Sequence, residues 1–195
     1  MQIYLVRTAQ ANSDVVNSTP ESAELKDIDL SLTELGQVQA DLTGKRLASV
    51  EFDAILSSPL LHHLATANGI IRYQKNCKTT EPMSDLYAKD ISNGITDESM
   101  AERGKNIERY LTNNFQNDAK VLLIASGDFM SRFLIPSLLR LPARVIKSGI
   151  KFRCDSCAVS RIDLNRDGRR ADGVLINDTS HLDVDEAQIP KIKNS

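Results

Sequence analysis

The sequence predicts an α/β fold in which helices cover both faces of a mostly parallel sheet: a three-layer α/β/α sandwich with a C-terminal β-hairpin. Short apolar segments alternate with longer segments of helical periodicity, which is typical of strand-helix units in a parallel sheet. Residues 120–125 (Lys-Val-Leu-Leu-Ile-Ala) are nearly all apolar, as expected of a strand covered on both faces. Near the end of the chain, Asn165-Arg166-Asp167-Gly168 has the turn chemistry of a hairpin.

The first strand is predicted at residues 2–6, because four of these five residues are apolar. The polar segment from Ala11 to Leu30 follows, and a loop of this length in a compact domain is usually functional, often a lid. Thr33 is a suitable N-cap for a helix over residues 34–49, in which apolar side chains recur at spacings of three and four. The predicted buried face of this helix consists of Leu35, Val38 and Leu42.

Residues 52–56 are predicted as the second strand. Ser58 as N-cap and Pro59 at the first helical position predict a helix from Pro59 to about Arg72. A weak third strand is expected from Lys78 to Pro82, followed by an irregular segment over residues 84–97.

A further helix is predicted over residues 98–116, and another over 129–140, after the most apolar strand. The hairpin strands are expected at 158–163 and 173–176. The apolar face of the helix predicted over residues 98–116 consists of Met100, Ile107, Leu111 and Phe115. Since no internal repeat or linker stands out, we expect a single domain over residues 1–195.

Composition narrows the function classes. The 24 Lys and Arg residues against 26 Asp and Glu give a net charge of -2 without a basic run, so no nucleic-acid partner is expected. No segment approaches the length of a membrane span, and the chain opens with a strand where a secretory signal would lie, so we expect a cytoplasmic protein without a membrane partner.

The three cysteines, Cys77, Cys154 and Cys157, form an odd set that suits reduced thiols better than a disulfide framework. The lone Cys-x-x-Cys has no second pair or nearby histidine. In an extended segment, residues three apart point to opposite faces, so neither a metal site nor a redox role is expected.

Three predicted strand ends carry polar residues: Arg7-Thr8, Ser57-Ser58 and Ser126-Gly127. Ligands of open α/β sheets bind outside the carboxyl ends of the strands. Helices start just after the second and third of these ends, and helix N-termini favour anions. The residues therefore predict an anion site, with phosphate as the expected ligand. A surface arginine beside an N-cap-like threonine would give the same first pattern.

At this point the chain resembles the histidine phosphatase superfamily, the phosphoglycerate mutase-like proteins, over nearly its whole length. The resemblance implies their α/β fold. The matching segments are Ile3-Tyr4-Leu5-Val6-Arg7, Leu32-Thr33-Glu34-Leu35-Gly36 with Gln39-Ala40, Phe52 to Leu60 with Thr66-Ala67, Val121 to Ile124 with Gly127, and Asn177 to Leu182.

The resemblance also shows where this chain departs from the family pattern. The family's nucleophilic histidine follows the first arginine, and Thr8 holds that position here. The second histidine corresponds to Ser126, the second arginine to His62 and the general-acid glutamate to Ala88. Of these five positions only Arg7 matches. We expect no phosphohistidine catalysis, because an alcohol needs an adjacent base to attack phosphorus and the leaving group has no proton donor.

Our hypothesis is a pseudoenzyme that keeps the fold and binds a small phosphorylated or other anionic ligand, without catalytic residues, cofactor or metal. The expected ligand-binding residues are Arg7, Thr8, Asn12, Ser58, His62, Ser126 and Gly127.

Two alternatives remain open. The chain could be a phosphomonoester hydrolase or phosphomutase of weak activity or altered mechanism, in which His62 attacks phosphorus and Asp85 or Asp90 is the acid. It could also be a non-catalytic interaction protein, and a protein partner or homo-oligomer is left open. His62 and His63 lie roughly 100° apart around a helix axis, so they cannot bind one metal from one face. His181 is expected to be structural.

Overall fold

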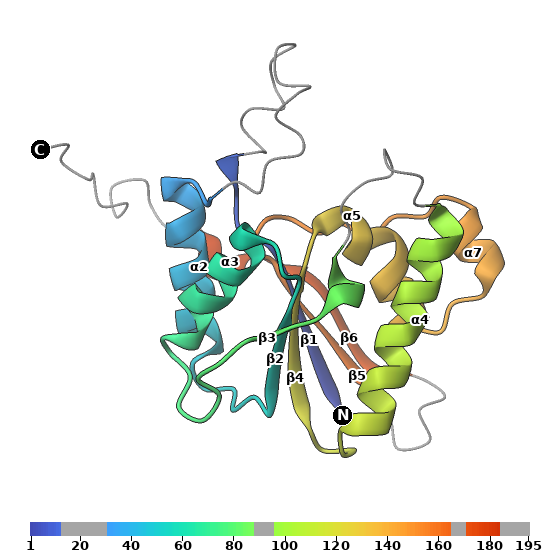
Figure 1. Cartoon of the computed structure of the whole chain (residues 1–195), viewed down its shortest axis with the longest axis horizontal. Coiled ribbons are helices and arrows are strands. Elements are labelled where there is room, and N and C mark those ends of the chain that lie inside the picture. The colour runs from blue at the N-terminus through green and yellow to red at the C-terminus, as the bar shows by residue number, and fades with distance from the viewer. Residues whose placement is uncertain (13–30, 88–95, 165–170, 184–195) are drawn as a thin grey trace, which may run out of the picture.

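A six-stranded mixed sheet forms the middle layer of the computed structural model, with helices on both faces (Figure 1). The structure describes residues 1–12, 31–87, 96–164 and 171–183. The strand order is β3-β2-β4-β1-β5-β6. The strands are β1 (Gln2–Arg7), β2 (Ala54–Ser57), β3 (Glu81–Pro82), β4 (Lys120–Ala125), β5 (Val159–Leu164) and β6 (Ala171–Asp178).

The predicted central strand is confirmed. β4 pairs in parallel with β1 on one side and with β2 on the other, while β5 and β6 form the predicted antiparallel hairpin. Every residue from Val121 to Ala125 is fully buried, which explains the uninterrupted apolar run. The third strand is shorter than predicted and contains only Glu81–Pro82.

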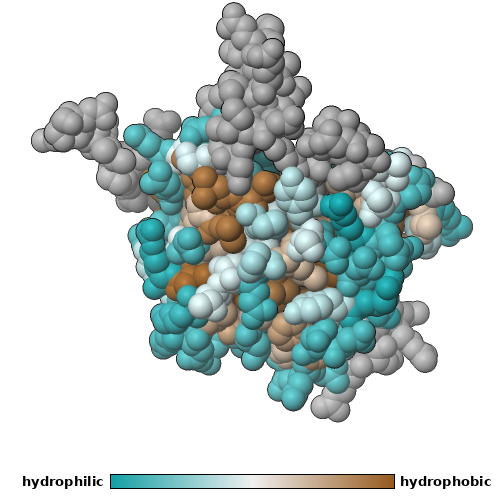
Figure 2. Space-filling model, in the orientation of Figure 1, coloured by the Kyte–Doolittle hydropathy of each residue, from teal (hydrophilic) through white to brown (hydrophobic). Residues whose placement is uncertain are grey.

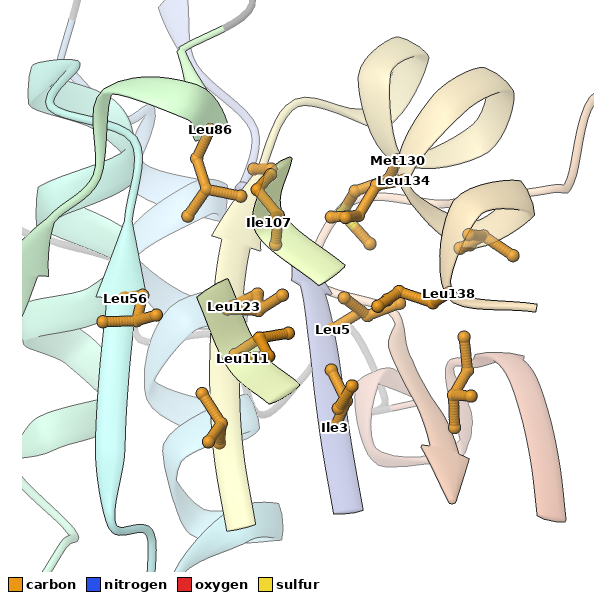
Figure 3. Close-up of a cluster of buried hydrophobic side chains, with 14 of the residues drawn as sticks. Ile3, Leu5, Leu56, Leu86, Ile107, Leu111, Leu123, Met130, Leu134 and Leu138 are labelled. Carbon is orange, nitrogen blue, oxygen red and sulfur yellow. The ribbon is translucent and has the colours of Figure 1, made fainter. Parts of the chain in front are cut away.

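Successive residues of β1 supply the two halves of the core. Ile3 and Leu5 face the side covered by α4 (Asp97–Asn114) and the helices after β4, as the side chains in Figure 3 show. Tyr4 and Val6 face the opposite side, under α2 (Glu34–Leu47) and α3 (Leu61–Ile71). This period of two is the expected consequence of the strand pleat.

α4 confirms the predicted helix and its apolar face. Thr96 caps it, with its hydroxyl accepting a hydrogen bond from the Ser99 amide, and Met100, Ile107 and Leu111 are buried. Phe115, just after the last turn, packs against the same core. The short turns η2 (Ser84–Leu86) and η5 (Ser180–Leu182) complete the framework.

The predicted buried face of α2 is wrong. Leu35 is 41% exposed, and Val38 and Leu42 are only half-buried. The residues that are buried instead are mostly small: Gly36, Ala40, Thr43, Gly44 and Leu47.

The reason for this correction is the close approach of α2 to α3. A Cβ atom at Gly69 of α3 would lie 2.7 Å from the Ala40 Cβ, and one at Gly44 would lie 2.8 Å from the Gly69 carbonyl oxygen. Large side chains cannot fit between the two helices, so the leucines at the start of each helix, Leu35 and Leu61, are exposed. Figure 2 shows hydrophobic residues at the surface in this part of the molecule.

The predicted start of α3 is also corrected. The helix begins at Leu61 with Leu60 as N-cap, and no side chain caps it. Ser58 is fully buried because its amide extends the β2 ladder to the Ile124 carbonyl, at 3.1 Å. Pro59 therefore lies in the turn between strand and helix, and not in the first helical turn.

The helix predicted over 129–140 begins two residues earlier and is interrupted. It consists of α5 (Gly127–Phe129), the π-helical turn η4 (Met130–Leu134) and α6 (Ile135–Leu138), and α7 (Ala143–Lys147) follows. Pro136 has no N–H to donate to the preceding turn, which disfavours a regular α-helix at this point.

His63 on α3 is a buried imidazole without a hydrogen-bond partner for either ring nitrogen among the described residues. Burial lowers its pKa to about 3, with a further contribution from the adjacent His62. His181 follows the prediction of a structural role: its Nε2 lies 3.0 Å from the Thr43 hydroxyl and 3.2 Å from the Cys157 carbonyl oxygen. Burial lowers the pKa of His181 as well.

The contact between α2 and α3 predicts that Gly69→Ala destabilises the protein. The new methyl group would meet Ala40 at a distance that real Cβ atoms do not adopt, so the helices must move apart at a cost of about 1–3 kcal/mol. Urea unfolding followed by circular dichroism measures the change. Asn68→Ala, at an exposed position of the same helix, is the matched control and should gain a few tenths of a kcal/mol. Equal stability of Gly69→Ala and wild type would contradict the packing argument.

The burial of His63 predicts a loss of stability in mild acid. The unfolded chain binds a proton at His63 below about pH 6.5, whereas the folded chain does not until about pH 3. Stability should therefore fall between these limits, by up to about 1.4 kcal/mol per pH unit.

Urea unfolding at several pH values from about 7 to 4.5 tests this prediction, and His63→Leu should flatten the profile. A residual slope in the variant would report on His181, whose pKa is lowered in the same direction. Identical pH profiles for the variant and the wild type would refute the assignment.

Candidate functional site

The parallel pairing brings the predicted strand ends together. The Thr8 amide donates to the Ala125 carbonyl at 3.0 Å, which places the end of β1 beside the end of β4. The Ser58 amide donates to the Ile124 carbonyl and places the end of β2 on the other side of β4. The three polar ends therefore lie at one edge of the sheet, as the strand order requires.

Arg7 is held by a loop from the distant C-terminal third. Its Nη1 donates to the Cys154 carbonyl oxygen at 2.8 Å, and its own carbonyl accepts from the Cys157 amide at 3.0 Å. The Nε atom is buried and has no hydrogen-bond partner among the described residues. One face of the side chain lies so close to Gly127 that a Cβ there would be 2.7 Å from Nε. Glycine is thus required by contact with Arg7.

A surface hollow of about 450 Å³ opens beside this arginine, and we call it the Arg7 hollow. It is lined by Arg7, Gly127, Asp128, Ser131, Lys151, Phe152, Arg153, Cys154 and Asp155. Three of these residues are cations and two are acids. Arg153 Nε lies 2.8 Å from the Asp155 carboxylate, and Lys151 Nζ lies 3.9 Å from that of Asp128. Another hollow, of about 430 Å³, lies around Glu51 and Lys120 at the opposite ends of the strands, away from these residues.

Sequence reasoning missed the segment 151–155 as part of the site. The pattern that could have indicated it is Lys151 and Arg153 two residues apart, which in an extended segment places two cations on one face. The Cys-x-x-Cys motif drew attention to thiol chemistry instead. The functional contact at Cys154 is made by its main-chain carbonyl.

Thr8 is buried, and its hydroxyl is hydrogen-bonded within the fold. Its hydroxyl lies 3.2 Å from the Thr66 hydroxyl and 3.4 Å from the His62 carbonyl oxygen. Thr66 also accepts from the Ala9 amide at 3.1 Å. The hydrogen-bond partners of Thr8 Oγ1 among the described residues are thus a hydroxyl and main-chain carbonyls, with no carboxylate or imidazole.

Of the seven predicted ligand-binding residues, Arg7 and Gly127 line the Arg7 hollow, and the other five are not among its lining residues. Ser126 is half-buried as the N-cap of α5, beside Gly127, and Ser58 is buried at the end of β2. His62 lies in the first turn of α3, with its ring centroid 4.3 Å from that of His63. Asn12 bonds to Ser31, its Nδ2 3.1 Å from the Ser31 hydroxyl.

Some predictions fall on the parts of the chain outside the described residues. These are the acid position Ala88, the alternative acid Asp90, the hairpin turn at residues 165–168 and most of the proposed lid, residues 13–30. Asp85 is described and half-buried in η2.

The thiols of Cys154 and Cys157 are unsuited to nucleophilic chemistry. Burial raises the pKa of Cys154 to about 11 and that of Cys157 to about 12, so both are protonated near neutral pH. The motif is not extended as predicted, because Cys157 adopts a left-handed conformation (φ 57°) and the Ala158 amide bonds to the Asp155 carbonyl. Within the described ranges, no group of three His, Cys, Asp or Glu side chains could hold a metal ion.

No helix in the described part of the chain combines the length and the apolar character needed to cross a lipid bilayer.

Comparisons with known proteins agree with this fold. The sequence model of the histidine phosphatase superfamily (branch 1) matches residues 3–90. A search of curated protein sequences gives no significant match.

Three solved structures illustrate the likeness. YhfR from Bacillus stearothermophilus superposes with a TM-score of 0.71 at 18% identity, over 93% of this chain and 98% of the other. The α-ribazole phosphatase from Shigella flexneri gives 0.67 at 19% identity, over 91% and 96%. Phosphoserine phosphatase from Entamoeba histolytica, in complex with 3-phosphoglyceric acid, gives 0.67 at 18% identity, over 93% and 98%.

At 18–19% identity, these structures support the fold alone. The fold that they support is the one that the sequence match implies. The comparisons confirm that the chain resembles the histidine phosphatase superfamily, in sequence over residues 3–90 and in the phosphoglycerate mutase-like fold of its described residues.

Proposed function

We propose that this protein binds a phosphate-like anion at Arg7 and has lost the phosphohistidine chemistry of its superfamily. The observation that carries the proposal is the combination of two side chains at the end of β1. Arg7 keeps its place at the edge of the Arg7 hollow, while the neighbouring nucleophile position holds Thr8, whose hydroxyl is buried and bonded to Thr66.

The environment of Thr8 supports the loss of nucleophilic catalysis. An alcohol attacks phosphorus only when an adjacent base removes its proton. The hydroxyl and carbonyl groups around Thr8 Oγ1 in the described structure are not bases of useful strength near neutral pH. Its burial also keeps the oxygen away from a ligand in the hollow.

The residues at the remaining family positions also support the loss of phosphohistidine chemistry. Ser126 stands where the second imidazole would lie, and a hydroxyl can donate one hydrogen bond but carries no charge. His62 stands where a second arginine is expected, and an imidazole does not provide the planar, permanently charged fork of a guanidinium. Ala88 replaces the general acid and cannot donate a proton.

The charges around Arg7 support anion binding. A guanidinium stays charged throughout the physiological range and suits phosphate or carboxylate oxygens. Lys151 and Arg153 line the same hollow and add two positive charges, although Asp128 and Asp155 offset part of this charge. The net balance of Arg7, Lys151 and Arg153 against two carboxylates favours a small anion.

The main alternative is a weak or altered phosphomonoester hydrolase or phosphomutase, and the names of the similar solved structures are what favours it. A non-catalytic interaction protein is the further alternative, for which exposed Leu35 and Leu61 offer only a small apolar surface. Cytoplasmic location and a homo-oligomer or protein partner stay predictions.

Anion binding predicts that phosphate, sulfate or a phosphorylated metabolite raises the melting temperature of the wild type. A ligand at 100 times its Kd should add about 2.7 kcal/mol, or roughly 5–11 °C for a chain of this length. Arg7→Met should abolish this shift, because the guanidinium is removed and most of the side-chain volume is kept.

Arg46→Met is the matched control, since it removes an exposed arginine that pairs with Asp178. Its ligand-dependent shift should equal that of the wild type. No shift with any compound, or an equal shift in Arg7→Met, would refute anion binding at Arg7.

Loss of catalysis predicts that Thr8→His combined with Ser126→His restores little phosphatase activity. The acid position would still be Ala88 and the clamp position His62, and a missing general acid alone costs about 10²- to 10⁴-fold. Release of p-nitrophenol from its phosphate ester measures the activity. Robust turnover by the double variant, or Arg7-dependent turnover by the wild type, would refute the proposal.

A further inference from the structure

We propose that Asn177 is a positioning residue for Arg7, because its side chain and that of Asp155 lock together the loop that holds the guanidinium. The inference deepens the proposed function, since it concerns the arginine at which the anion is proposed to bind. Asn177 belongs to β6, whereas Arg7 ends β1, and no hydrogen bond links them directly among the described residues.

Asn177 and Asp155 form a reciprocal pair of hydrogen bonds. The Asp155 amide donates to Asn177 Oδ1 at 2.6 Å, and Asn177 Nδ2 donates to the Asp155 carboxylate at 2.9 Å. The Asn177 amide in turn donates to the Ser160 hydroxyl at 3.0 Å. Three hydrogen bonds therefore fix Asn177 between the 153–157 loop and β5.

The backbone of Asn177 is specialised for this role. Its φ of 61° lies in the left-handed region, which asparagine tolerates better than most residues. It lies near the register shift between Val159 and Arg161 in the pairing of β5 with β6. Such irregularities re-aim side chains, and here the asparagine amide reaches the adjoining loop.

The 153–157 loop, which this pair holds, contacts both the side chain and the main chain of Arg7. Cys154, one residue before Asp155, supplies the carbonyl that accepts from Arg7 Nη1. Cys157, two residues after it, supplies the amide that donates to the Arg7 carbonyl. Asp155 and Ser156 are the two residues between these contacts, and fixing Asp155 therefore helps to hold the loop that makes both.

The guanidinium has little else to orient it. Its bond to the Cys154 carbonyl is the one protein hydrogen bond recorded for it in the described structure, and Nε is buried without a partner. Gly127 closes one face and leaves no room on that side. A shift of the Cys154 carbonyl would therefore release the Arg7 head group from its position in the Arg7 hollow.

The negative charge of Asp155 keeps its hydrogen bond from Asn177 intact near neutral pH. The hydrogen bond from Asn177 holds the pKa of Asp155 below its ordinary value, aided by Arg153 and Arg7, while burial opposes this effect. Asp155 thus remains a carboxylate, which accepts the Asn177 amide as the geometry requires.

The experiment uses Asn177→Gly, because glycine accepts the positive φ and removes only the side chain. The readout is the Arg7 side-chain Nε–H signal in a ¹⁵N-labelled sample, followed by hydrogen exchange and by titration with inorganic phosphate. In the wild type this buried proton should exchange slowly. In Asn177→Gly we expect exchange at least about tenfold faster and phosphate affinity about tenfold weaker, because the guanidinium is no longer pre-organised for the ligand.

A double variant, in which the residues at positions 155 and 177 are interchanged, separates positioning of Arg7 from a general loss of stability. Asn177→Asp alone should behave like Asn177→Gly, because two carboxylates would face each other. Adding Asp155→Asn restores the side-chain hydrogen bond with donor and acceptor exchanged, while the main-chain amide at position 155 still donates to the side chain at position 177. The total charge is unchanged, and slow exchange of the Arg7 proton should recover. Asp178→Asn, at the adjoining residue that pairs with Arg46, is the matched control and should leave the Arg7 signal as in the wild type.

Hydrogen exchange of the Arg7 Nε–H tests the positioning role of Asn177 even if phosphate does not bind. Slow exchange in the wild type and rescue by the double variant support positioning, and a missing phosphate titration would then refute only the proposed anion site. Unchanged Arg7 exchange in Asn177→Gly, or failure of the folded double variant to restore it, would overturn the inference.

Discussion

The parallel pairing of β1 with β4 is the constraint on which the rest of the structure depends. It aligns Arg7 with Ala125 and so places the arginine side chain against Gly127 at the start of the next helix. Because both strands are buried on both faces, their ends are the places where polar side chains can meet solvent and ligand. The helices, the hairpin and the Arg7 hollow are all arranged around these two strands.

The position of Arg7 does not depend on the identity of the residue that follows it. Arg7 is held by main-chain groups of the 153–157 loop and by the packing of Gly127, none of which requires a histidine at position 8. Thr8 instead adds to the packing of α3 through Thr66. Thr8 is thus part of the contact between helix and sheet, while Arg7 lines the Arg7 hollow.

Much of the framework followed from local sequence patterns. The all-apolar run of β4 predicted its central place, Thr33 caps α2 as predicted, and the convergence of three strand ends was correctly anticipated. The buried face of α2 was mispredicted, because periodicity assigns large apolar residues to the core and cannot reveal that Gly69 lies against Ala40. Ser58 failed as a cap for a similar reason: its amide was already used by the sheet.

The sequence by itself determined the layered α/β fold and the arginine at the end of its first strand, because strand period, helix period and turn chemistry are local properties. Only the tertiary structure decided what surrounds that arginine. The Cys154 carbonyl and the Asp155–Asn177 pair come from segments about 150 to 170 residues away in the chain, and their contacts run partly through main-chain atoms. A carbonyl is common to every residue, so no sequence pattern marks the one that will orient a guanidinium.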